Sequence, residues 1–329
     1  MMRWPQRAAM AALITLLPAT ALPAAGQGGP SPSLPGIRLP VPTLGPPPAG
    51  AVDGLPIKVI GQTVAGSAGR AEIVSLDRIW DQAPHNAFTD LIRFRERWYC
   101  AFREGSAHVS PDGAVRVISS SDAVHWSTAW YVSTEYADLR DPKLSITGDQ
   151  RLMLSVAAAY NPPTEINLQS LAWYSRDGRD WGISFKIGEP GMWLWRVAWH
   201  RGSAFSMAYS TLVDRFISMY VGPAGLRFHA VTDRVLDDGQ PSEATLLFNN
   251  DDSALCLLRR DGGAASAWLG RSEPPYRGWR WRDLGKRLGG PAMARLPDGR
   301  LVAAGRLYDG RNGPRFAGWT RKKPSSPNS

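Results

Sequence analysis

The sequence predicts an all-β fold, a β-propeller of four-stranded blades in which five repeats are visible. After about residue 70 the chain consists of short apolar runs separated by Gly, Asp, Asn and Pro, without an amphipathic helix of ordinary length. Many short strands are typical of a sandwich, a barrel or a radial repeat, and an internal period decides among them. The expected strands include 91–94, 98–102, 115–119, 152–157, 170–174, 195–199, 204–209, 245–248, 255–258, 267–270 and 301–305.

One turn recurs at the spacing of a propeller blade. The segments 120–126 and 175–181 both read Ser-x-Asp-x-x-x-Trp, and weaker versions end at Phe228, Trp279 and Trp319. The aromatic ends at 126, 181, 228, 279 and 319 are 55, 47, 51 and 40 residues apart, which matches blades of ~40–50 residues. In this turn we expect the Asp to accept backbone N–H bonds, the Gly to allow positive φ, and the Trp to pack between neighbouring blades.

The two ends of the ring are expected to meet. Each repeat except the last has a further strand-like stretch after its aromatic residue. A strand within 71–80 would supply the fourth strand of the last blade, and pairing the chain ends in this way leaves no exposed edge. We therefore predict a propeller over residues 70–319, closed by an N-terminal strand.

The segments outside this body have the composition of targeting and linker sequence. Residues 1–25 read as a signal peptide, with Arg3 and Arg7 before the apolar run 8–21 and a small-x-small site at 19–21. That run is shorter than the ~20 residues that a membrane span needs. Residues 26–69 are a Pro/Gly-rich linker and 320–329 a basic disordered tail. We expect a secreted or periplasmic protein with no transmembrane helix after signal removal, or a membrane-tethered one if the signal stays uncleaved.

Composition and charge exclude several classes of protein. A chain of 329 residues that is 43% apolar, with two Cys, has a real core and is not a disulfide scaffold. The net charge is +9, but three unopposed basic residues lie in 1–52 and three more in 320–329, which leaves +3 on the body. This balance argues against a nucleic-acid partner. No metal-ligand spacing, phosphate loop or nucleophile elbow is present, so we expect no metal and no cofactor. We also expect the protein to be a monomer.

The repeated turns resemble the Asp-boxes, or BNR repeats, of sialidase-like propellers. Segments 85–91, 98–105, 140–143, 289–291 and 296–300 are similar to bacterial secreted proteins of the exo-alpha-sialidase-like group, over about residues 75–310. The resemblance implies six blades, an arginine triad for a substrate carboxylate, an Asp acid/base and a Tyr nucleophile with a Glu partner. This sequence lacks an Arg-Ile-Pro motif before the first blade, and no Tyr-bearing blade follows Trp319. It is either a five-bladed relative or a six-bladed fold cut short. Residues 140–142, Arg-Asp-Pro, also resemble five-bladed glycosidases of the invertase and arabinanase type, which place one carboxylate on each of three blades.

A propeller gathers the ends of its innermost strands around one axial mouth, so site residues should recur at equivalent places in successive blades. Glycoside hydrolysis requires two carboxyl groups, except where a Tyr attacks. The candidate acid/base groups are Asp90, His108, Asp141 and Glu243. The candidate substrate ligands are Arg103, Arg140, Arg259 and Arg306, whose planar guanidinium binds both oxygens of a carboxylate, and Trp195, which neighbours Trp193 and Arg196 and could stack on a sugar.

Two functions stay open at this point. The first is an exported exo-glycosidase acting on glycans with an acidic sugar, whose carboxylate Arg103, Arg259 and Arg306 would hold. The alternative is a non-catalytic glycan- or protein-binding propeller that has lost the nucleophile-bearing blade. Each candidate also has a structural interpretation, such as a turn cap for Asp90, a salt bridge for Arg103 or blade packing for Trp195.

Overall fold

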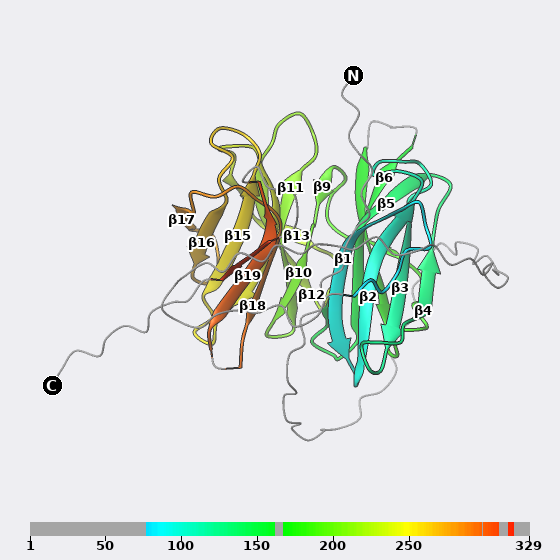
Figure 1. Cartoon of the computed structure of the whole chain (residues 1–329). Helices are drawn as coiled ribbons and strands as arrows, with labels where there is room; N and C mark the ends of the chain where they lie inside the picture. The colour runs from blue at the N-terminus through cyan, green and yellow to red at the C-terminus, as the bar shows by residue number, and fades with distance from the viewer. Residues whose placement is uncertain (1–76, 162–166, 298, 309–314, 319–329) are drawn as a thin grey trace.

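The protein is an all-β propeller of five antiparallel sheets, and the described residues contain no helix (Figure 1). The computed structural model describes residues 77–161, 167–297, 299–308 and 315–318. The predicted signal peptide, linker and basic tail lie outside these residues. Within them there is no helix long and apolar enough to cross a membrane.

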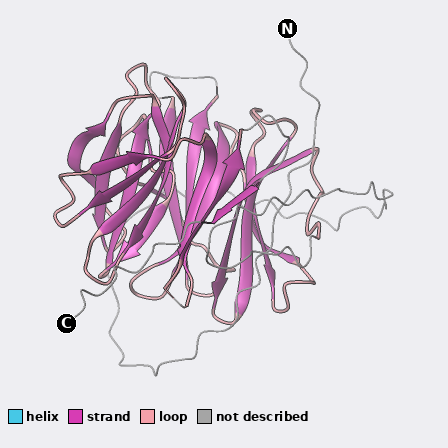
Figure 2. Ribbon diagram, turned by 60° about the vertical axis from the view of Figure 1, so that its left-hand side comes forward, coloured by secondary structure: helices cyan, strands magenta, loops and turns pink. Residues whose placement is uncertain are grey.

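Each sheet is an up-and-down meander that forms one blade, as Figure 2 shows. Blade one contains β1 (His85–Phe94), β2 (Arg97–Gly105), β3 (Ala114–Ser120) and β4 (Ser127–Val132), and blade two contains β5 (Ala137–Ile146), β6 (Leu152–Tyr160), β7 (Leu168–Ser175) and β8 (Phe185–Lys186). Blade three contains β9 (Met192–Trp193), β10 (Val197–His200), β11 (Ser203–Ser210), β12 (Ile217–Pro223) and β13 (His229–Leu236). Blade four contains β14 (Pro241–Phe248), β15 (Ala254–Arg260), β16 (Trp268–Ser272) and β17 (Arg280–Asp283), and blade five contains β18 (Leu288–Arg295), β19 (Leu301–Leu307) and β20 (Arg315–Gly318).

The predicted closing strand falls largely outside the described residues. Its described part, 77–80, is not a strand. Ile79 and Trp80 pack against Cys100 and Phe102 of blade one, and the Trp80 indole Nε1–H donates to Glu104 Oε1 at 2.6 Å. These residues therefore bury their apolar side chains on the first blade, and closure of blade five by 71–76 stays a prediction.

The recurring turns have the hydrogen bonds expected from their sequence. Asp177 Oδ1 accepts the backbone N–H of Arg179 at 2.8 Å and that of Asp180 at 2.9 Å, and these bonds lower the pKa of Asp177. Gly178 has φ +78°. Trp181 is buried and stacks on Trp130 of blade one, with ring centres 5.4 Å apart. Asp122 accepts the N–H groups of the two residues after Ala123 in the same way, so both turns confirm the predicted local structure.

The core lies between successive blades. One cluster joins blades one and two through residues such as Val117, Leu139 and Trp173, and a second joins blades three and four through Met207 and Ala244. Both cysteines are buried free thiols, in β2 and β15.

The innermost strands share an irregularity near the end where each enters its blade. Strands β1, β5, β14 and β18 each shift register by one residue against their neighbour, at Ala87/Asp90, Arg140/Lys143, Pro241/Ala244 and Gly289/Ala292. In blade three the corresponding stretch is fully interrupted, because β9 ends at Trp193 and β10 begins at Val197. A bulge re-aims the side chains beside it, so this end of the ring is where the chain departs from a regular sheet.

Candidate functional site

The bulges place polar side chains of several blades around one mouth. The bulge of β1 contains Phe88, that of β5 contains Asp141 and that of β14 contains Glu243. Phe88 has φ +62° and Asp141 has φ +48°, in the left-handed region that non-glycine residues rarely adopt. Such backbone strain persists where the surroundings over-determine it, and it clusters at functional sites. Its occurrence at equivalent places in adjacent blades marks this end as the candidate site.

Asp90 joins three blades. Its Oδ1 lies 2.7 Å from Arg196 Nη2 and its Oδ2 lies 3.2 Å from Arg196 Nη1, which is a two-pronged ion pair between blades one and three. The same Oδ2 accepts the backbone N–H of Leu144 in blade two at 2.8 Å. Hydrogen-bond donors therefore occupy both oxygens of the Asp90 carboxylate. From the sequence, Arg196 was noted only as a neighbour of Trp195 and was not identified as the partner of Asp90.

Glu243 joins blades four and five. Its Oε1 accepts from Arg259 Nη1 at 2.8 Å, and its Oε2 accepts the backbone N–H of Gly290 at 2.7 Å. Arg259 also pairs with Asp261 at 2.8 Å. Arg259 and Glu243 thus lie together, as the sequence predicted for the mouth, but they are bound to each other.

Asp141 pairs with a buried lysine that the sequence analysis did not single out. The Lys143 ammonium lies 3.6 Å from Asp141 Oδ1, donates to the Pro142 carbonyl at 3.3 Å, and lies 4.7 Å from the ring centre of Trp195. Burial lowers the pKa of Lys143, against the charges of Asp141, Asp90 and Glu243, which raise it. The charges of three candidate carboxylates, from blades one, two and four, therefore act on this ammonium group, and among the described residues Asp141 is the one within ion-pair distance of it. Its only sequence signal is a charge within a strand that is otherwise apolar after Pro142.

Arg140 is held by aromatic rings. Its guanidinium carbon lies 5.5 Å from the ring centre of Phe88 and 6.0 Å from that of Trp193. The carboxylate oxygen nearest to its Nε is Asp138 Oδ2, at 3.9 Å, and the buried Nε has no hydrogen-bond partner among the described residues. Of the four candidate arginines, Arg140 is the one whose guanidinium has no carboxylate or hydroxyl within hydrogen-bond distance in the described structure.

His108 and Arg306 lie at the rim of the mouth. The His108 ring meets the rings of Phe88 and His85 edge-on, with centres 5.1 and 5.3 Å apart. Partial burial lowers the pKa of His108, and the charges of Arg140, Arg103 and Arg306 lower it further. Arg306 donates from Nε to the Tyr308 hydroxyl at 3.0 Å.

Arg103 and Trp195 are buried among protein atoms. Arg103 is 0% exposed, donates from Nε to Asp138 Oδ1 at 2.6 Å, and satisfies its other nitrogens on Ala107 O at 2.8 Å and Ser110 Oγ at 2.9 Å. This geometry favours a structural role, tying the β2–β3 loop to blade two, over contact with a substrate. Trp195 is 3% exposed and has Lys143 on its ring, which leaves no open face for a sugar.

Tyr209 is a further residue of the mouth that the sequence did not reveal. Its ring stacks on Trp193 with centres 5.4 Å apart. Burial raises the pKa of Tyr209, and the charges of Asp141 and Glu243 raise it further. A phenol in this setting holds its proton firmly, so it is poorly suited to act as a nucleophile. It lies in an apolar strand, β11, where a buried Tyr is ordinary core.

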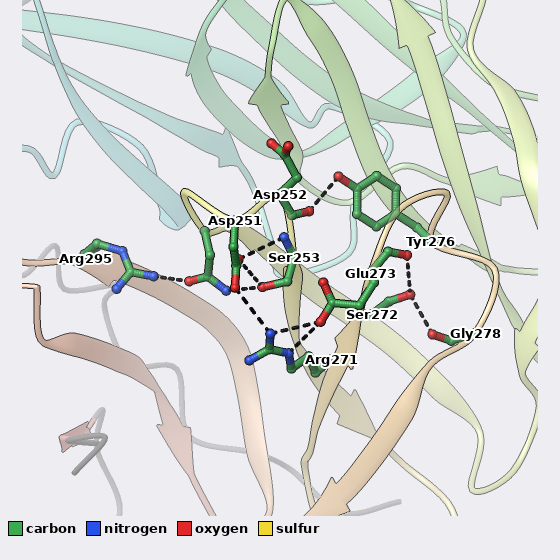
Figure 3. Close-up of polar contacts among 10 residues, drawn as sticks. Asp251, Asp252, Ser253, Arg271, Ser272, Glu273, Tyr276, Gly278 and Arg295 are labelled. Carbon is green, nitrogen blue, oxygen red and sulfur yellow. Dashed lines mark hydrogen bonds and ion pairs between the residues drawn. The ribbon is translucent and has the colours of Figure 1, made fainter. Parts of the chain in front are cut away.

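A second polar cluster lies at the opposite end of blade four and is separate from the mouth. Figure 3 shows Asp251 bonded to Ser253, with Arg271 reaching both Asp251 and Glu273. The Tyr276 hydroxyl donates to the Asp252 carbonyl at 2.8 Å. The charged side chains here are largely exposed and paired with one another, as in a solvated loop. Nowhere in the described residues, this cluster included, are three His, Cys, Asp or Glu side chains grouped as metal ligands.

Comparisons with known proteins bear on the fold. No protein-family model matches the chain, and no curated protein matches its sequence. A solved protein of unknown function from Dyadobacter fermentans DSM 18053 has a TM-score of 0.60 at 16% identity, over 67% of this chain and 75% of that one. This likeness shows a shared fold.

Propeller glycoside hydrolases also appear among the structural neighbours. The GH43 protein BlXynB from Bacillus licheniformis has a TM-score of 0.49 at 12% identity, over 68% of this chain and 48% of its own. An exo-beta-1,3-galactanase from Clostridium thermocellum has a TM-score of 0.49 at 14% identity, over 69% of this chain and 56% of its own. This chain thus spans about half the length of those two enzymes. None of the comparisons supports the resemblance to sialidases.

Proposed function

We propose that the protein is a glycoside hydrolase whose active site is the axial mouth, and that its substrate is a glycan with an acidic sugar. The observation that carries the proposal is the position of Asp90, Asp141 and Glu243 at the irregular ends of the innermost strands of three blades, where their charges act on the buried ammonium of Lys143. Hydrolysis of a glycosidic bond uses two carboxyl groups beside the bond, one as proton donor and one as base or nucleophile. The mouth offers such groups together with arginines that suit an acidic substrate.

The hydrogen bonds distinguish the three carboxylates. Among the described residues, the Asp141 carboxylate has an ion pair with Lys143 at 3.6 Å as its side-chain contact, whereas both oxygens of Asp90 and of Glu243 accept hydrogen bonds. Asp141 is therefore the carboxylate most available to accept a proton from an attacking water. Glu243 is the second member of the pair, because, like Asp141, it lies in the bulge of an innermost strand. Asp90 then has a structural role, because its hydrogen bonds to Arg196 and to the Leu144 N–H connect blade one to blades three and two.

Hydrolysis of a panel of fluorogenic glycosides tests this proposal. The panel contains a sialoside, a glucuronide, a galacturonide and the matching neutral glucoside and galactoside. We expect the purified protein to hydrolyse at least one acidic member, and Asp141→Asn and Glu243→Gln each to lower kcat by ~100-fold or more, as expected for loss of an acid/base group. Asp251→Asn, at the opposite end of blade four, is the matched control and should retain activity. Absence of turnover across the panel would overturn the proposal.

One observation favours a second candidate function, a propeller that binds glycans without cleaving them. Both oxygens of Asp90 and of Glu243 accept hydrogen bonds from arginines and backbone amides, so these two carboxylates already serve to hold blades together. Binding of the same glycosides, measured by calorimetry without any turnover, would support this function.

We further propose that the protein is exported, because the basic and then apolar residues of 1–25 precede a Pro/Gly-rich linker. Expression of the full chain in a bacterial host, followed by mass analysis of its N-terminus in the periplasmic fraction, tests this. A mature protein that starts near residue 22 is expected, and an intact cytoplasmic chain would contradict it.

A further inference from the structure

Arg140 differs from Arg103, Arg196 and Arg259 in having no carboxylate within hydrogen-bond distance. Arg103, Arg196 and Arg259 each have a carboxylate oxygen within 2.8 Å. For Arg140 the corresponding distance to Asp138 Oδ2 is 3.9 Å, which is too long for a hydrogen bond. A guanidinium offers five N–H donors and is always charged. The Arg140 guanidinium therefore has no hydrogen-bonded carboxylate, and the nearest one, Asp138, is bonded to Arg103.

The surroundings hold this guanidinium in one orientation. The Phe88 and Trp193 rings, 5.5 and 6.0 Å away, provide cation–π contacts. Phe88 occupies a bulge with φ +62° to reach this position. The Arg140 side chain is 20% exposed, and its Nε faces Asp138 Oδ2 in the interior. Neither of these two buried atoms has a hydrogen-bond partner among the described residues. Because Nε points inward, the exposed part of the group is the outer edge that carries the two Nη atoms.

An oriented guanidinium edge of this kind fits one ligand chemistry well. Two parallel N–H donors match the two oxygens of a planar carboxylate, and the pair is stronger than a bond between neutral groups. Arg140 and Asp141 are both at the register shift of β5, the irregular end of this innermost strand, so a ligand held by Arg140 would lie at the same end of blade two as the proposed acid/base group.

We propose that the outer edge of Arg140 binds the carboxylate of the acidic sugar as a two-pronged fork, without Arg103 or Arg259. This inference rests on the proposed function, since it names the group that would select the acidic substrate there. Arg103 and Arg259 do not take part, because their donors are already bound to Asp138 and to Glu243 and Asp261. A neutral sugar makes no such fork.

Binding of matched sugar pairs tests the inference without requiring turnover. Ligand-observed NMR titrations at pH 7 would use methyl glucuronide and methyl galacturonide against methyl glucoside and methyl galactoside, with galactose 6-sulfate as a tetrahedral anion. We expect at least one uronide to bind ~10-fold or more tightly than its neutral partner, within the range of charge-assisted pairs. Arg140→Gln should abolish that difference, and Arg140→Lys should recover less than half of it, because a point charge cannot form the fork. The control Arg93→Gln, an exposed residue paired with Glu96, should leave it unchanged.

Several results would overturn the inference. These are equal affinity for uronide and neutral sugar in the native protein, a difference that survives Arg140→Gln, full recovery by Arg140→Lys, or tighter binding of the sulfated sugar than of either uronide. Thermal melting of each variant verifies folding, and Arg140→Lys keeps the test decisive if Arg140→Gln fails to fold. Uronide-selective binding without hydrolysis would refute the proposed enzyme but support the fork at Arg140. Hydrolysis without a preference for uronides over neutral sugars would support the enzyme but refute the fork.

Discussion

Replacement of Arg103 by Met separates its structural role from a role in substrate binding. The side chain is 0% exposed and donates to Asp138 Oδ1 at 2.6 Å. Met fills much of the same volume but leaves the Asp138 carboxylate, which is 7% exposed, buried without the Arg103 guanidinium that is hydrogen-bonded to it. Removing one partner of a buried ion pair typically costs about 3–5 kcal/mol. Since domains are stable by ~5–15 kcal/mol, this is a large fraction of the total, and urea unfolding should show a clear drop in the midpoint concentration.

Two further variants give this prediction its controls. Arg93→Met removes an exposed ion pair with Glu96, which is expected to contribute less than ~1 kcal/mol. In Arg103→Met combined with Asp138→Leu, both charges are absent, so much of the lost stability should return. The reasoning is refuted if Arg103→Met unfolds at the same urea concentration as the native protein while its affinity for an acidic sugar falls.

Three other predictions concern the turns, the rim histidine and the thiols. Asp177→Ala removes the acceptor of two backbone N–H groups and should lower the unfolding free energy by ~1–2 kcal/mol; a thermal midpoint equal to the native one would contradict this. Burial lowers the pKa of His108 in the folded state, so the unfolded chain binds its proton first as pH falls below ~6.5. The stability contribution of neutral His108 is therefore complete above that pH and is lost as pH falls toward the folded pKa. His108→Gln should make the free energy of unfolding depend less on pH between pH 7 and 5. An unchanged slope of unfolding free energy against pH would argue against this role of His108. Burial raises the pKa of Cys100 to about 12 and also raises the pKa of Cys256. Neither thiol should therefore react with a thiol reagent until the protein is unfolded, and rapid labelling of the native protein would show the burial to be incorrect.

The local elements of this fold could be predicted from the sequence because their interactions are local. In the turn from Ser175 to Trp181, the Asp177 carboxylate binds amides two and three residues away, so a short motif contains both partners. The alternation of strand-like runs and turns, repeated at blade spacing, predicted the propeller for the same reason. Asp90, Asp141 and Glu243 were also identified as candidates, since a charge at the start of an apolar strand is visible in sequence.

The partners of those carboxylates could be found only in the tertiary structure. Asp90 and Arg196 are 106 residues apart in the chain, and Glu243 is 47 residues from Gly290. No local pattern links such residues, because the ring of blades brings them together and the bulges of the innermost strands decide which way each side chain points. For the same reason the sequence assigned the substrate carboxylate to Arg103, with Arg259 and Arg306, and left Arg140 out of that set. Packing buries Arg103 against Asp138 and leaves the Arg140 guanidinium between two rings, so burial and pairing, which depend on neighbours from other blades, decide which arginine is available to a ligand.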